Sequence, residues 1–152
     1  MDIQIDSREK ARAIQKIIQT FDRRGVNWFV SKLPVGDYIS LDNARLSIDR
    51  KQNLLELCSN VTQQQKRFIA ELERAEASGI RLIILVEHGG GIERLEDVMY
   101  WHNPRLKESP LAVSGERLYR KLEAIGRAHN VQFEFCTKAQ TGRRIIELLG
   151  GE

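Results

Sequence analysis

The sequence predicts an α/β fold in which a mixed central sheet lies between helices. Short runs rich in β-branched and aromatic residues alternate with longer segments whose apolar residues recur at helical spacing. No internal repeat, low-complexity tract or linker rich in proline and serine divides the 152 residues. We therefore expect a single domain over residues 1–152, with a βαβββαβ core followed by a C-terminal αβα unit.

The first part of the chain predicts a strand, a helix and three more strands. Residues 2–6 alternate polar and apolar side chains, which is typical of a short strand with Asp6 at its carboxyl end. Apolar residues recur at helical spacing over residues 14–21, and Gly25 supplies a left-handed exit from that helix. Three strands are then expected to form a meander, at residues 26–30, 33–39 and 45–51.

The second part predicts further helices and strands in alternation. A single apolar stripe over residues 68–76 indicates a helix, and the aliphatic run at 80–86 is typical of a buried central strand. The glycines at 89–91 interrupt the chain before a short helix around 92–99 and an irregular stretch at 100–110. The last expected elements are a helix capped by Ser114, a strand at 131–136 and a helix at 140–149.

Composition argues against a membrane protein and against a disulfide-rich one. No stretch approaches the roughly 18–20 uninterrupted apolar residues of a membrane span, and the first residues do not resemble a signal sequence. We therefore expect no membrane partner and a cytoplasmic location. Cys58 and Cys136 are too few for a disulfide framework or a zinc cluster, so both are expected to be reduced core thiols.

The charge pattern is a weak indication of a polyanionic partner. The formal net charge is +3, from 24 basic and 21 acidic residues. Residues 101–152 hold 9 basic and 6 acidic side chains, so the whole excess lies in the C-terminal third. A mildly basic binding face and an ordinary solvated surface both fit this pattern.

The segment from Gly36 to Lys51 carries the residues best suited to chemistry. Asp49 and Lys51 lie two residues apart on one predicted strand, so their side chains project from the same face of the sheet. A tight hairpin would bring Asp37 beside Asp49, where two buried carboxylates require a positive partner. Mg²⁺ prefers carboxylate oxygens and completes its shell with water and phosphate. Asp37 and Asp49 are therefore candidate metal ligands, with Lys51 beside the reacting water and phosphate.

Spacing alone leaves a second interpretation open, in which Asp49 and Lys51 are simply neighbouring charges on a solvated face. The residues after the first strand favour a site. Asp6, Arg8 and Glu9 stand at its carboxyl end, and the carboxyl ends of strands border the ligand crevice in sheets of this kind. We expect these side chains to approach the same point.

Four blocks of the sequence resemble, in order, those of the XPF-type structure-specific nuclease domain: Ile5-Asp6-Ser7-Arg8-Glu9, Val35-Gly36-Asp37-Tyr38, Ile48-Asp49-Arg50-Lys51 and Ile83-Ile84-Leu85-Val86-Glu87. The resemblance covers about residues 2–149 and implies a restriction-endonuclease-like fold. It implies a metal-dependent DNA endonuclease that hydrolyses phosphodiester bonds of branched, flap or fork DNA, with Mg²⁺ or Mn²⁺ as cofactor. The implied catalytic residues are Asp6, Arg8, Glu9, Asp37, Asp49 and Lys51, of which Asp37 and Asp49 bind the metal.

The resemblance also implies contacts with DNA and with a second copy of the chain. The implied nucleic-acid contacts are Arg8, Arg50, Lys66 and Arg67, although an ordinary exposed helix start explains Lys66 and Arg67 equally well. Members of the family dimerise through their C-terminal helices, and the last predicted helix is apolar on more than one side. A homodimer through this helix, or packing of the helix across a broad groove, would explain Ile145, Ile146, Leu148 and Leu149.

The sequence departs from the family pattern in three ways. The family has Glu-Arg-Lys where this chain has Asp49-Arg50-Lys51, and an Asp four positions after the lysine where this chain has Leu55. The length leaves no room for a helix-hairpin-helix module or a helicase, so we expect a stand-alone domain like those of bacteria and phages. The alternative function is a non-catalytic module of the same fold that binds DNA junctions or a nuclease partner. Because Asp37, Asp49 and Lys51 are all present, we favour the enzyme.

Overall fold

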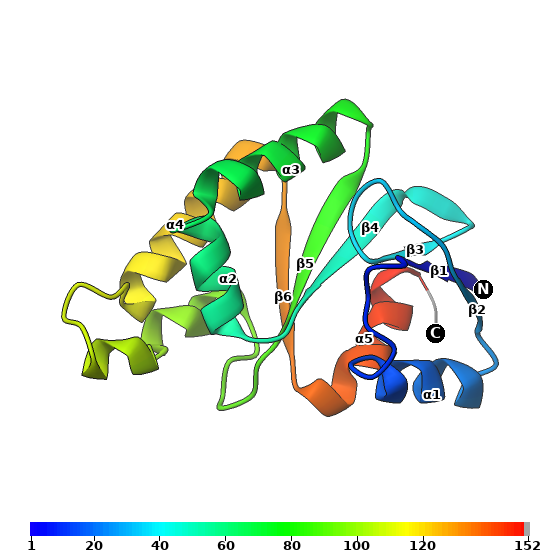
Figure 1. The fold of residues 1–152 in the computed structure, drawn as a ribbon, viewed down its shortest axis with the longest axis horizontal. Coiled ribbons are helices and arrows are strands. Elements are labelled where there is room, and N and C mark those ends of the chain that lie inside the picture. Colours follow the sequence, from blue (N-terminus) through cyan, green and yellow to red (C-terminus); the bar gives the residue numbers. More distant parts are fainter. Residues whose placement is uncertain (151–152) are drawn as a thin grey trace.

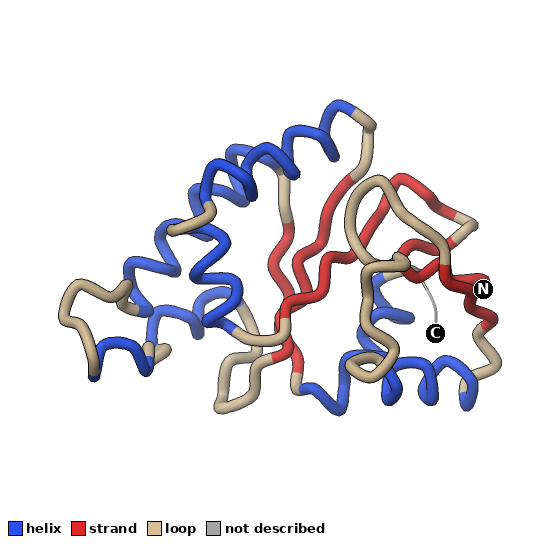
Figure 2. Tube along the Cα trace, in the orientation of Figure 1, coloured by secondary structure: helices blue, strands red, loops and turns tan. Residues whose placement is uncertain are grey.

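The computed structural model describes residues 1–150, which form a six-stranded sheet with helices on both faces (Figures 1 and 2). The strands are β1 (Asp2–Ile5), β2 (Asn27–Val30), β3 (Tyr38–Ser40), β4 (Asn43–Lys51), β5 (Arg81–Glu87) and β6 (Gln132–Cys136). Their order in the sheet is β2-β1-β3-β4-β5-β6. β3 is antiparallel to both of its neighbours, and the other three pairings are parallel. The predicted mixed α/β fold class is confirmed.

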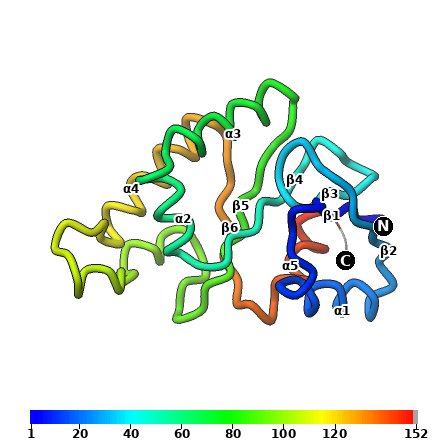
Figure 3. The backbone as a smooth tube through the Cα atoms, in the orientation of Figure 1, coloured from blue at the N-terminus to red at the C-terminus, as the bar shows by residue number. Residues whose placement is uncertain are grey.

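Two groups of helices cover the two faces of this sheet (Figure 1). One group comprises α2 (Leu54–Val61), α3 (Gln65–Ala77) and α4 (Gly115–His129). The other comprises α1 (Gln15–Arg23) and α5 (Thr141–Leu148), which lie side by side although they are far apart in the chain (Figure 3). Short 3₁₀ turns at Leu95–Tyr100, Pro104–Lys107 and Lys138–Gln140 complete the helical elements.

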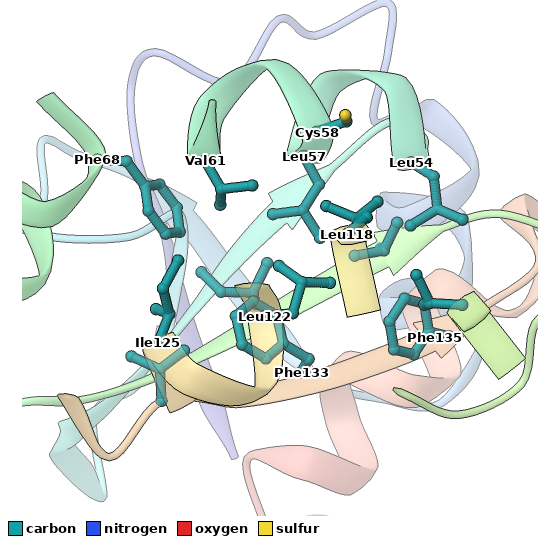
Figure 4. Packing of buried hydrophobic residues seen from close by; sticks show 14 of the residues in the cluster. Leu54, Leu57, Cys58, Val61, Phe68, Leu118, Leu122, Ile125, Phe133 and Phe135 are labelled. Carbon is teal, nitrogen blue, oxygen red and sulfur yellow. The ribbon is translucent and has the colours of Figure 1, made fainter. Parts of the chain in front are cut away.

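Each face of the sheet has its own apolar core. Leu82, Ile84 and Val86 point toward α2, α3 and α4, while Ile83 and Leu85 point toward α1 and α5. This alternation follows from the period of two in a strand, and it explains why β5 is aliphatic along its whole length. Figure 4 shows the first core, in which α2 and α4 side chains meet those of β6. Both cysteines are buried free thiols, as expected.

The predicted meander of three strands after the first helix is wrong. β1 lies between β2 and β3, so β2 forms an edge of the sheet and pairs in parallel with β1. α1 is the crossover of this βαβ unit, and the connection over residues 31–37 returns the chain to the far side of β1. The strand predicted at 33–39 is correspondingly short and begins only at Tyr38.

A helix that the sequence analysis missed stands between the site strand and the helix over residues 65–77. α2 begins after Asn53, whose side chain accepts a hydrogen bond from the amide of Glu56, as in a helix N-cap. Leu54, Leu57 and Val61 then pack into the core. The segment with Lys66 and Arg67 therefore starts the second helix after β4, and not the first.

The C-terminal elements follow their predicted order. Ser114 caps α4 through the amide of Arg117, and β6 and α5 come after it. Ile145 and Ile146 of α5, and Leu149 just after it, are buried in the core with α1. Packing inside the chain thus accounts for the apolar faces of this helix, and the homodimer stays a prediction. None of the helices within residues 1–150 has the length and apolarity needed to cross a membrane.

Candidate active site

The hairpin formed by β3 and β4 brings Asp37 beside Asp49. Tyr38 pairs with Ile48 in the antiparallel register, so the preceding Asp37 lies opposite Asp49. The amide of Asp37 donates to the carbonyl of Ile48 at 2.7 Å, and Oδ2 of Asp37 accepts from the amide of Arg50 at 2.8 Å. These two hydrogen bonds fix both the backbone and the carboxylate of Asp37 against β4.

Gly36 makes this close approach possible. Its φ is +75°, a conformation that side chains with a Cβ rarely adopt, and a Cβ added there would lie 2.1 Å from Oγ of Ser47. The Ser47 hydroxyl is buried and donates a hydrogen bond of 3.0 Å to the carbonyl of Val35. A glycine is therefore needed before Asp37, because any larger residue would prevent the turn from packing onto β4.

Lys51 lies on the same face of β4 as Asp49. Its Nζ is 3.2 Å from Oδ2 of Asp49 and 5.9 Å from the centre of the Phe68 ring on α3. The contact with Asp49 is a close ion pair, but it is not aligned as a hydrogen bond, and Oδ2 of Asp49 has no hydrogen-bond partner within residues 1–150. Oδ2 of Asp49 is thus a buried oxygen that, among the described residues, is paired with the Lys51 ammonium but accepts no aligned hydrogen bond.

Electrostatics at the pair favour a cation. Burial and the neighbouring charges of Asp49 and Glu9 raise the pKa of Asp37 to about 9, although the Arg50 amide opposes this shift. Two carboxylates held this close share a proton or a cation, because their charges repel in a poorly solvated place. The Asp37–Asp49 pair therefore attracts a proton or a cation.

Asp6 and Arg8 form a structural pair at the end of β1. The Asp6 side chain is fully buried, and it accepts hydrogen bonds from the Leu33 amide at 2.8 Å and from Nε of Arg8 at 2.6 Å. The Asp6 amide donates to the carbonyl of Asp37 at 2.8 Å. Asp6 therefore fixes the connection that leads to Asp37. Both oxygens of its carboxylate already accept hydrogen bonds from within the chain. Arg8 keeps an exposed side chain at the rim.

Glu9 and Arg50 form a buried ion pair. Nη2 of Arg50 lies 2.7 Å from Oε2 of Glu9, and Nη1 of Arg50 contacts Oε1 of Glu87. The Arg50 side chain is 5% exposed. Both ends of its guanidinium are thus bound to carboxylates of the chain, which does not favour the expected contact of Arg50 with DNA.

An open cleft of about 250 Å³ joins these residues. It is lined by Asp37, Asp49 and Lys51 from the hairpin, by Glu56 at the start of α2, and by Arg8 and Glu9 after β1. Of the predicted catalytic set, only Asp6 is absent from the lining.

A second hollow meets the cleft at Lys51. Arg67, Asn60 and Gln64 line it, together with Phe68 and Glu71. Arg67 therefore lies close to the site, while Lys66 is exposed beside Gln65 and Ile69 in a separate surface depression. The predicted DNA contacts Lys66 and Arg67 thus lie on different sides of the start of α3.

Two further carboxylates of this region were not predicted as site residues: Glu71 was not singled out by the sequence, and Glu87 was named only as the end of the fourth family block. Glu71 on α3 is partly buried, and burial together with the Asp49 charge raises its pKa, while Lys51 opposes the shift. Glu87 ends β5 and contacts Arg50. The signal for Glu71 was its place among the regularly spaced apolar residues of α3. The signal for Glu87 was its position at the end of an aliphatic strand.

These residues belong to a fold that is known from other proteins. The ERCC4 domain matches residues 5–148 of this chain. The chain belongs to the ERCC4 domain family. The resemblance to the XPF-type nuclease domain is thereby confirmed. No curated protein sequence matches this ERCC4 chain.

Solved structures with the same fold include XPF from Aeropyrum pernix. That structure has a TM-score of 0.70 and 18% sequence identity, over 98% of this ERCC4 chain and 63% of the XPF chain. XPF from Aeropyrum pernix in complex with DNA has a TM-score of 0.69 and 17% identity, over 97% and 62% of the two chains. At this identity the likeness shows the fold, and the ERCC4 chain spans less than two thirds of these XPF chains.

Proposed function

We propose that this ERCC4 domain is a divalent-metal-dependent DNA endonuclease that acts on branched, flap or fork DNA. The observation that carries the proposal is the placement of Asp37, Asp49 and Lys51 together at one cleft, on one face of the β3–β4 hairpin. The reaction would add water across one P–O bond of the DNA backbone, leaving one phosphate end and one hydroxyl end.

The residues present fit a hard divalent cation. The buried Oδ2 of Asp49 lacks a hydrogen-bond partner within residues 1–150, and Asp37 faces it. No group of three or more His, Cys, Asp and Glu side chains is gathered as a metal site in the described part of the chain. This suits Mg²⁺ or Mn²⁺ better than zinc, because Mg²⁺ keeps several waters and needs only one or two protein carboxylates.

Asp37 and Asp49 would hold the ion, which when bound lowers the pKa of a coordinated water and polarises the phosphate. Lys51 supplies a fixed positive charge beside Asp49, where it can orient the attacking water and offset the negative charge that develops on the phosphate. Burial lowers the pKa of Lys51, but the carboxylates around it outweigh burial and raise that pKa, so the ammonium stays charged. Lys51 therefore acts here as a cation and not as a base.

Exposed cationic side chains around the cleft would hold the DNA backbone. Arg8 lines the cleft with its exposed side chain, and Arg67 lines the adjoining hollow. Binding of DNA by this chain is supported by its family and by the fold shared with an XPF structure that contains DNA. The preference for branched shapes rests on the resemblance to structure-specific nucleases.

A cleavage assay tests the proposal. Labelled forks, flaps and plain duplexes are incubated with Mg²⁺ or Mn²⁺, and with EDTA as the metal-free control. We expect cuts in the branched substrates, loss of at least about a hundredfold in rate for Asp37→Asn and for Lys51→Ala, and no cuts with EDTA. Glu116→Gln on the exposed face of α4 is a matched control that should cut like the wild type.

Two results would overturn this function. Wild type that binds junctions but cuts nothing in any metal would identify the chain as the non-catalytic binding module. Full activity of Asp37→Asn and Lys51→Ala would move catalysis away from the hairpin.

A further inference from the structure

Glu87 belongs to a buried polar chain that links α5 to the cleft. One of its oxygens contacts Nη1 of Arg50, and the other accepts a hydrogen bond of 2.7 Å from the Thr141 hydroxyl. The Glu87 side chain is 3% exposed, and Thr141 is fully buried at the start of α5. Both oxygens of Glu87 are therefore occupied, and the carboxylate has a fixed orientation.

Arg50 continues this chain to the cleft in two directions. Its side chain donates from Nε and Nη2 to Glu9, with the shortest contact at 2.7 Å. Its backbone amide donates to Oδ2 of Asp37 at 2.8 Å. A shift of Arg50 would consequently move two carboxylates that line the cleft.

We infer that Glu87 is a positioning residue: it holds the Arg50 guanidinium between two carboxylates, and through Arg50 it fixes Glu9 and Asp37 at the cleft. This inference rests on the proposed function, because the positions of the cleft carboxylates affect catalysis only if these carboxylates hold a cation. Glu87 itself does not line the cleft.

The balance of charge explains why a second carboxylate is needed. A buried guanidinium with a single acidic partner would be drawn toward other carboxylates nearby, and Asp37 already accepts a hydrogen bond from the backbone amide of the same arginine. Glu87 occupies the guanidinium end that Glu9 leaves free. Arg50 then leaves the negative charge of Asp37 and Asp49 available to a cation.

The test compares two properties in wild type, Glu87→Gln, Thr141→Val and Thr141→Ser. The first is Mn²⁺ affinity, measured by calorimetry without DNA. The second is the rate at which the Arg50 Nε–H proton exchanges with solvent, measured by NMR. Glu87→Gln is expected to weaken Mn²⁺ binding by about tenfold or more, the usual effect of losing a residue that orients metal ligands. It should also speed Arg50 exchange by a similar factor.

The threonine variants and a surface control complete the design. Thr141→Val removes the hydroxyl that holds Glu87 and should give a smaller change in the same direction, whereas Thr141→Ser should match the wild type. Glu116→Gln makes the same chemical change at an exposed ion pair on α4 and should alter neither property.

Each outcome bears on the inference. Wild-type Mn²⁺ affinity and wild-type Arg50 exchange in Glu87→Gln would overturn it, and if that variant does not fold, the same result in Thr141→Val would do so. If the wild type itself binds no Mn²⁺ and cuts no DNA, the proposed function fails. Arg50 exchange in the variants then still decides whether Glu87 positions Arg50.

Discussion

The amide of Arg50 donates a hydrogen bond of 2.8 Å to the carboxylate of Asp37 across the β3–β4 hairpin. The backbone of one strand thus orients the candidate metal ligand of the other, while the side chain of the same arginine is held by Glu9 and Glu87. Within the cleft, the β3–β4 hairpin is therefore the unit whose hydrogen bonds set the orientation of Asp37.

The turn before Asp37 is expected to tolerate no side chain. Gly36→Ala would place a Cβ 2.1 Å from the Ser47 hydroxyl at a φ of +75°, so either the turn or β4 must shift. We expect a loss of about 1–3 kcal/mol in the free energy of unfolding, measured by urea denaturation. Gly90→Ala is the matched control, because Gly90 also has a positive φ but no atom within 4 Å of an added Cβ. Equal losses in the two variants would show that crowding at Ser47 is unimportant.

Asp6 is expected to make stability depend on pH. Burial would raise the pKa of Asp6, but hydrogen bonds from the Leu33 amide and from Arg8 outweigh it and lower the pKa below the ordinary 3.8. A lowered folded-state pKa contributes stability that is present above the unfolded pKa and is lost as the pH falls through the folded pKa. Asp6→Asn should therefore lose about 1–3 kcal/mol at neutral pH.

The pH series distinguishes this effect from a general loss of packing. The difference between wild type and Asp6→Asn should shrink as the pH drops below 3.8. Asp42→Asn, at an exposed position, should stay close to wild type at every pH. A constant difference for Asp6→Asn across the series would contradict a role for its charge.

Glu71 is expected to help keep Lys51 charged. Burial lowers the pKa of Lys51, whereas Asp49, Glu56 and Glu71 raise it. Glu71→Gln removes one of these charges and should lower the Lys51 pKa, which an NMR titration of the lysine ε-carbon measures. Glu73→Gln, two residues further along α3 and exposed, should leave that pKa unchanged. The same Lys51 pKa in Glu71→Gln and wild type would exclude this contribution.

Local patterns were enough to predict that Asp37, Asp49 and Lys51 lie together. Asp37 and Asp49 belong to one hairpin, where pairing of adjacent strands sets the register, and the alternation of β4 puts Asp49 and Lys51 on one face. The long aliphatic run of β5 likewise identified a central strand. Such features depend on neighbours in sequence, which the chain itself displays.

Contacts between distant segments were not predictable in this way. The place of β1 between β2 and β3 depends on a crossover through α1, and nothing in residues 26–51 shows it. The partnership of Arg50 with Glu87 requires the parallel pairing of β4 with β5. The N-cap of α2, Asn53 followed by Glu56, was a readable local signal that was missed.

The central claim is that Asp37 and Asp49 hold one divalent ion together, and calorimetric titration with Mn²⁺ tests it most directly. The wild type is expected to bind one ion, and Asp37→Asn, Asp49→Asn and the double variant should each lose that binding to the same extent, because each removes part of one shared site. Binding that persists unchanged in either single variant, or a wild type that takes up no Mn²⁺, would contradict the account.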